Sequence, residues 1–229
     1  MRGSDPATEV LFLSCSICNV RKEKRFCPAL HGRICAQCCG EQRELTLDCP
    51  SECPYLQQAR QHEKPRTIGE TPPAETFPAI ALREAFLSEH ETLIAGILQT
   101  LGRVTRADRS LHDRDLIGGL ANVAQSYQTL IASGLVYQEA LPNPVQQAVI
   151  GVLQQLFQEF REVEQKHRGY TTLKDGEVLQ ALVFTLRLIH MHSSGRLLAR
   201  GFIDFLHERF PEQQPTLNGE GEPSRIIMP

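Results

Sequence analysis

The eight cysteines of this 229-residue chain are the residues whose type and spacing could do chemistry, and all of them lie in its first quarter. Their order along the chain is Cys15-x2-Cys18, Cys27, Cys35-x2-Cys38, Cys39 and Cys49-x3-Cys53. Thiolates two or three residues apart suit tetrahedral zinc, because one tight turn presents both sulfurs to a single ion. A segment this rich in cysteine cannot bury much apolar surface, so it needs something other than a hydrophobic core to hold it together. We therefore predict a module held together by bound metal.

Eight cysteines are enough for two four-thiolate zinc ions. The ions are bound either at sequential sites, where the first and second ligand groups share one ion, or in a cross-brace. The spacing favours the cross-brace, in which the first and third ligand groups share one ion: Cys15, Cys18, Cys35 and Cys38. The second and fourth groups share the other ion: Cys27, Cys39, Cys49 and Cys53. The adjacent Cys38 and Cys39 then serve different ions, since neighbouring side chains of an extended backbone point in opposite directions. His31 stays open as a substitute ligand, because Cys27-x3-His31 is also a metal-type pair.

The redox compartment decides between metal and disulfides for these thiols. Cysteine clusters of a reducing compartment usually hold metal, whereas an even count would also suit four disulfides if the chain were exported. The first residues lack the apolar centre of a secretory signal, and no stretch approaches the roughly 20 apolar residues of a membrane span. We therefore expect a soluble, cytoplasmic protein with no membrane partner.

The charge distribution bears on nucleic-acid binding. The net charge of −3 opposes a strong general attraction to nucleic acid. A basic excess nevertheless surrounds the first cysteines, from Arg21, Lys22, Lys24, Arg25 and Arg33. These side chains either contact phosphate or form an ordinary solvated loop between ligand pairs.

Beyond the cysteines the chain is predicted to be helical. A short helix over 55–64 is expected to close the module, and an apolar run at 10–13 to form its first strand. Residues 65–78 contain four prolines and read as a linker. From residue 79 on, apolar residues recur three or four apart, which is typical of amphipathic helices.

We expect five such helices, at about 79–104, 113–134, 144–169, 175–192 and 196–210. Their ends carry suitable signals: Asp113 or Asp115 can cap the second helix and Gly134 can stop it. Asn143 and Pro144 can open the third helix, and Gly169 can end it. The fourth helix is apolar on two faces, which predicts a central position.

The predicted fold class is mainly α, with a small N-terminal two-zinc finger followed by an all-α, five-helix bundle-like domain. The corresponding division is a Cys-rich module at 10–64, a linker at 65–78, a helical domain at 79–210 and a disordered tail at 211–229.

The stretch SCSICNVRKEKRFCPALHGRICAQCCGEQRELTLDCPSECPYL resembles the two-zinc cross-brace fingers of the RING, B-box, MYND and HIT group. It is also similar to uncharacterised bacterial proteins in which such a finger precedes a helical domain. A RING finger has a Cys-x-His element and ends in Cys-x2-Cys, whereas this chain has neither, which counts against ubiquitin-ligase activity. The resemblance implies a module that docks onto other proteins.

We predict a structural zinc-binding adaptor that mediates protein–protein interaction, and not an enzyme. A filled four-thiolate zinc has no open position for water, and the usual nucleotide, metalloprotease and serine-hydrolase motifs are missing from the sequence. The alternatives are a nucleic-acid-binding zinc finger and a thiol-based redox sensor. The sequence does not indicate an oligomeric state.

Overall fold

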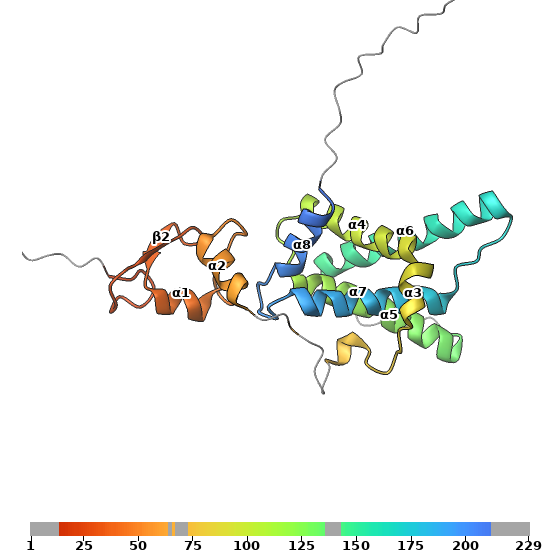
Figure 1. The fold of residues 1–229 in the computed structure, drawn as a ribbon, viewed down its shortest axis with the longest axis horizontal. Coiled ribbons are helices and arrows are strands. Elements are labelled where there is room, and N and C mark those ends of the chain that lie inside the picture. The colour runs from red at the N-terminus through yellow and green to blue at the C-terminus, as the bar shows by residue number, and fades with distance from the viewer. Residues whose placement is uncertain (1–13, 64–65, 67–72, 136–142, 212–229) are drawn as a thin grey trace, which may run out of the picture.

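The structure is a computed structural model, and it describes residues 14–63, 66, 73–135 and 143–211. The molecule is elongated, with the cysteine-rich part at one end and the long helices at the other (Figure 1). The described residues are mainly helical, with one two-stranded sheet, which confirms the predicted fold class.

The cysteine-rich part is built from a small hairpin and two short helices. Strands β1 (Arg25–Cys27) and β2 (Gly32–Ile34) pair antiparallel, with Phe26 opposite Arg33. His31, with φ of 49°, lies in the tight turn between them. Helix α1 (Ala36–Gln42) follows the hairpin directly. Helix α2 (Pro54–His62) begins with a proline at its first position and confirms the predicted closing helix. The strand predicted at 10–13 lies outside the described residues.

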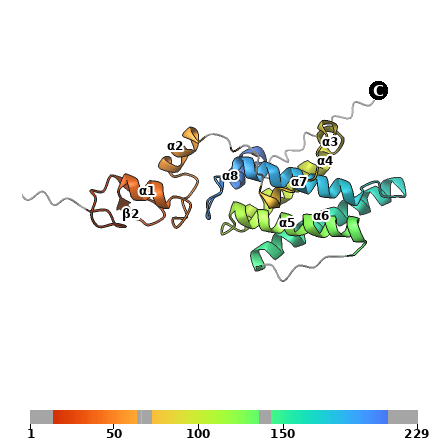
Figure 2. The same cartoon turned by 90° about the horizontal axis from the view of Figure 1, so that it is seen from below.

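The helical part contains one 3-10 turn and six α-helices among the described residues: η1 (Ala74–Thr76), α3 (Glu84–Glu89), α4 (Glu91–Ala107), α5 (Asp113–Ser133), α6 (Pro144–Arg168), α7 (Asp175–His192) and α8 (Gly201–Arg209). Helix α7 is central, as its two apolar faces predicted, and packs against α4, α5 and α8. Helix α5 also lies along α6, as Figure 2 shows. Large side chains from several helices fill one shared core, among them Phe86, Leu120, Phe157, Leu182 and Phe202.

The predicted helix ends of α5 and α6 are confirmed. Gly134 and Gly169 end these helices with φ of 71° and 81°, values that residues with a Cβ rarely adopt. The side chain of Asn143 accepts a hydrogen bond from the amide of Gln146 at 2.8 Å, and Pro144 follows it. The local chemistry of these ends therefore determined them without help from packing.

The helix predicted at 79–104 begins later than expected and is interrupted once. Residues 79–83 are not helical, and His90, with φ of −122°, separates α3 from α4. A side chain from the central helix explains the irregular start, because Arg187 donates hydrogen bonds to the carbonyl oxygens of Thr76, Phe77 and Ile80. The Ile80 carbonyl, the only one of the three inside the predicted helix, thus binds Arg187 instead of a helical amide.

The last helix begins later than predicted, at Gly201 instead of Arg196. The backbone between these two residues makes contacts elsewhere: the amide of Leu198 donates to the carbonyl of Glu44, and the carbonyl of Ala199 accepts from the amide of Asp113. The apolar periodicity places Leu87, Ile131 and Val163 on inner helix faces, but these three side chains are exposed. The last two lie toward the C-terminal ends of α5 and α6, beyond the buried middle of each helix.

The division into module, linker, helical domain and tail stays a prediction. Most of the 65–78 linker and nearly all of the 211–229 tail lie outside the described residues. Within the described part of the chain, no helix combines the length and the apolar character needed to cross a bilayer.

Candidate metal centre

Four of the predicted ligands form a compact group. The sulfurs of Cys15, Cys18, Cys35 and Cys38 all lie within 4.8 Å of one another. Sulfurs around a tetrahedral zinc are about 3.8 Å apart, given Zn–S bonds of about 2.3 Å. The four sulfurs would therefore need to move only slightly closer together to bind one metal ion. This group joins the first and third cysteine pairs, as the cross-brace predicts.

Two tight turns hold the sulfurs in place. In the first turn the amide of Ile17 donates to the sulfur of Cys15 at 3.4 Å, and Asn19 adopts a φ of 55° that folds the chain back. In the second turn Cys35 caps α1, and its sulfur accepts from the amide of Cys38 at 3.4 Å. Amide-to-sulfur bonds favour the thiolate form, which is the form that binds metal.

The four thiols differ in how readily they ionise. Backbone hydrogen bonds from Arg21 and Val20, together with the Arg21 side chain, lower the pKa of Cys18 to about 5. Burial, followed by hydrogen bonds with the three neighbouring cysteines, raises the pKa of Cys38 to about 12. Four negative charges therefore cannot share this space without a cation, and a divalent metal would supply that charge as it displaced the remaining protons.

The other four cysteines lie together but less tightly. All are buried, and they line one small enclosed cavity: Cys27, Cys39, Cys49 and Cys53. They come from β1, α1, the loop after α1 and the residue that precedes α2. Burial is the main cause that raises the pKa of Cys49, and Cys53 and Cys27 add to it. Among the described residues the sulfurs of this set do not reach the mutual 4.8 Å spacing of the first group. One metal-type group is therefore shown, and the second ion stays a prediction.

The expected extended backbone at Cys38 and Cys39 is wrong, although the two side chains do separate. These two residues lie inside α1, and not on an extended backbone. Successive side chains of a helix point about 100° apart, which is still enough to separate them. Cys38 belongs to the compact group, while Cys39 lines the second cavity.

His31 takes no part in the compact group. It lies in the hairpin turn with an exposed side chain, and the compact group consists of cysteines alone.

Three arginines lie close to the sulfurs, a contact that the sequence did not reveal. Arg25 Nη1 lies 3.5 Å from the sulfur of Cys39, and Arg43 Nη2 lies 4.0 Å from the same atom. Arg21 Nη2 lies 4.0 Å from the sulfur of Cys38. Arg25 also stacks over the ring of Tyr55, 4.6 Å from its centre. A four-thiolate zinc carries a charge of −2, so these cations would offset it.

The sequence shows the cluster of basic residues, but it does not show that some of their side chains point toward the cysteines. Only the hairpin and α1 turn Arg21 and Arg25 back toward the cysteines.

Comparison of the chain with protein-family models, with curated proteins and with solved structures gave no significant match.

Proposed function

We propose that this protein is a zinc-dependent adaptor whose N-terminal module docks onto a protein partner. The observation that carries the proposal is the compact group of four cysteine sulfurs within 4.8 Å of one another. In this proposal a second zinc binds the cysteines around the enclosed cavity, and the module belongs to the cross-brace class that its sequence resembles.

A structural role for the metal follows from the ligand set. Four thiolates fill the coordination sphere of zinc, so no site is left for a reactive water or a substrate. Most of the eight sulfurs are also buried. The binding free energy of the metal then contributes to folding, and we propose that the protein is not an enzyme.

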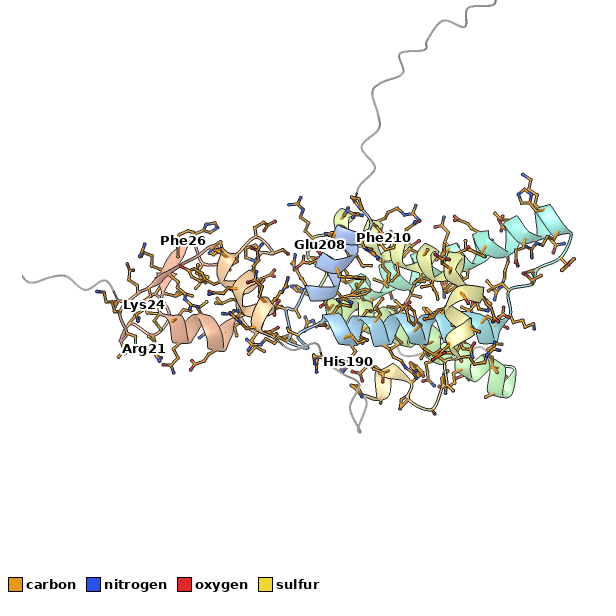
Figure 3. The ribbon with its side chains drawn as sticks, in the orientation of Figure 1. Arg21, Lys24, Phe26, His190, Glu208 and Phe210 are labelled. Carbon is orange, nitrogen blue, oxygen red and sulfur yellow. The ribbon has the colours of Figure 1, made fainter. Side chains whose placement is uncertain are left out.

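The docking surface in this proposal is the end of the module farthest from the long helices. Arg21 and Lys24 lie at this end, and Phe26, with 53% of its surface exposed, lies on the upper edge of the same hairpin region (Figure 3). Val20 and Leu30 are further exposed apolar side chains of the same hairpin region. Exposed apolar side chains flanked by cations suit a protein partner with an apolar patch and acidic residues around it.

The cations favour a protein partner over nucleic acid. Arg21 and Arg25 are directed toward sulfurs, and Arg33 forms an ion pair with Glu23 at 2.5 Å. Less of the basic run is therefore available to contact a phosphate backbone. Nucleic-acid binding remains the alternative, and it predicts an affinity that falls steeply with salt and is reduced in Lys24→Ala.

The metal assignment is tested by zinc analysis of purified variants. The wild type should hold two zinc ions per chain, and Cys35→Ser should lose at least one while the helical part keeps its circular dichroism. His31→Ala is the matched control within the module and should keep both ions. Unchanged zinc in Cys35→Ser, or disulfides between these cysteines, would overturn the assignment.

The docking surface is tested with a photo-crosslinking residue placed at position 26. A partner identified in this way should bind the purified wild type, and its affinity should fall about tenfold or more with Phe26→Ser. Leu87→Ser is the control, because Leu87 is also an exposed apolar residue but lies on α3. Equal effects of the two substitutions would contradict the proposal.

The redox-sensor alternative predicts zinc release at low peroxide. The amino groups of Arg25 and Arg43 near Cys39 favour slow release instead, because hydrogen bonds and positive charge reduce the nucleophilicity of a metal-bound thiolate.

A further inference from the structure

A cleft of about 560 Å³ lies between the cysteine-rich part and the helical part. Residues 50–52, from the loop between the last two cysteines, form one wall. The opposite wall comes from the end of α4, the loop that follows it and α8, which faces the module in Figure 3. The volume is typical of pockets that hold a small organic ligand, and such pockets often lie between two structural units.

The charge of this cleft is positive. Its lining includes three arginines, Arg106, Arg109 and Arg200, against two carboxylates, Glu52 and Asp204. Asp204 is already neutralised, because it accepts a hydrogen bond from Ser51 at 2.6 Å and forms an ion pair with Arg60 at 2.5 Å. Arg200 is paired in turn with Asp48 at 3.1 Å, so Arg106 and Arg109 against Glu52 leave a small excess of positive charge.

Two of these arginines could contact a ligand. Arg109 is exposed and forms no hydrogen bond or ion pair with the other described residues. Arg200 donates to Asp48 at 3.1 Å through one amino group, but its buried Nε has no acceptor in the described part of the chain. Buried donors are nearly always satisfied in folded proteins, so Arg200 has capacity for one further acceptor.

The other polar groups are held in position. Arg106 donates to the carbonyl oxygens of His207 and Phe210, which fixes its guanidinium at the end of α8. His207 Nε2 lies 3.0 Å from the hydroxyl oxygen of Thr105. Burial is the main cause that lowers the pKa of His207. The charges of Arg106 and Arg109 act in the same direction, while Asp204 acts against them.

We propose that this cleft binds a small soluble ligand that carries phosphate groups, such as a polyphosphate or a phosphate ester. Arg109 and Arg200 are the principal phosphate contacts. Guanidinium groups suit phosphate because two parallel N–H groups match two of its oxygens. A ligand in this position touches both parts of the protein and would hold them together.

The test uses inorganic pyrophosphate and the zinc-loaded full-length chain, with binding measured by isothermal titration calorimetry. Arg109→Gln should weaken pyrophosphate binding about tenfold or more, since a hydrogen bond to a charged group is lost. Arg103→Gln is the matched control, because this exposed arginine lies on α4 but lines a different groove. It should bind pyrophosphate like the wild type.

The ligand should also raise the melting temperature of the wild type more than that of Arg109→Gln. Zinc is measured in each variant, so that a lost metal is not mistaken for a lost anion site. Failure of the wild type to bind millimolar pyrophosphate would overturn the proposal, as would equal binding by the two variants. Binding of a short single-stranded oligonucleotide that competes with pyrophosphate and needs Arg109 would instead identify a polymer as the ligand and overturn the proposed small molecule.

Discussion

Asp113 is a buried carboxyl group that joins two helices. It is 1% exposed and lies at the first position of α5. Its two oxygens accept hydrogen bonds from the amides of Phe202 and Ile203, each at 3.2 Å, so that it caps α8 from a distant part of the sequence. Burial raises its pKa to about 7, although Ser193 and the two amides act in the opposite direction.

This raised pKa predicts how stability depends on pH. The folded protein keeps a proton on Asp113 that the unfolded chain loses above about pH 4, so this group's contribution to stability should decrease as pH rises from about 4 to 7. Asp113→Asn keeps an acceptor oxygen but cannot ionise. The difference in unfolding free energy between the two proteins should therefore change, in favour of the variant, by on the order of 2 to 4 kcal/mol across this range.

Urea unfolding at a series of pH values measures that difference. Because metal loss at low pH affects both proteins alike, it cancels in the comparison. Parallel pH profiles for the wild type and Asp113→Asn would show that the buried carboxyl does not titrate in this range.

Helices α5 and α6 approach each other closely at a pair of glycines. The sequence shows Gly118-Gly119 only as a weak point in a helix, because glycine is a poor helix former. In the structure a Cβ on Gly119 would lie 2.7 Å from Val149 Cγ1, and a Cβ on Gly118 would collide with the side chain of Gln146. The glycines therefore allow the contact between the two helices.

Gly119→Ala should consequently destabilise the protein although alanine favours helix. Overpacking typically costs about 1 to 3 kcal/mol, which outweighs a gain of about 1 kcal/mol from helix propensity. Gly151→Ala in α6 is the control, since a Cβ there meets nothing within 4 Å, and it should raise stability by up to about 1 kcal/mol. Thermal unfolding distinguishes these opposite signs, and a stabilised Gly119→Ala would show that α6 can move away.

The whole molecule is held together by a polar junction between the metal module and the helices. Glu44, only 2% exposed, accepts hydrogen bonds from Arg60 at 2.9 Å and from Ser194 at 2.8 Å. Arg196 donates to the carbonyl oxygens of Gly40 and Arg43 at the end of α1. The module is thus attached through its own backbone and a buried charge.

Removing Arg60 should weaken this junction strongly. Breaking a buried ion pair costs about 3 to 5 kcal/mol, and Arg60 is partly exposed, so we expect about 2 to 4 kcal/mol for Arg60→Ala. Hydrogen exchange of the amides in α1 and α8 measures the loosening. Arg33→Ala breaks a pair with Glu23 in which the arginine is exposed, and it should cost about 1 kcal/mol or less. Equal protection in the two variants would contradict a junction that depends on Glu44.

The sequence by itself determined the features that rest on local chemistry. Cysteine spacing predicted which four sulfurs meet, and Asn143, Pro144, Gly134 and Gly169 predicted helix ends, because ligand turns and helix caps involve residues only a few positions apart. Apolar periodicity likewise predicted the central position of α7, since a helix with two apolar faces can bury both only inside the bundle.

Only the tertiary structure decided what depends on partners distant along the chain. Arg187 binds the carbonyl oxygens of Thr76, Phe77 and Ile80 in the irregular segment before α3, and the contacts of Leu198 and Ala199 delay α8 until Gly201. Contacts between distant segments also decide three other features. These are the direction of the Arg21 and Arg25 side chains, the burial of Glu44 and the positive cleft. Each of these features depends on side chains from separate segments of the chain. The neighbouring residues in sequence do not indicate which distant segments come into contact.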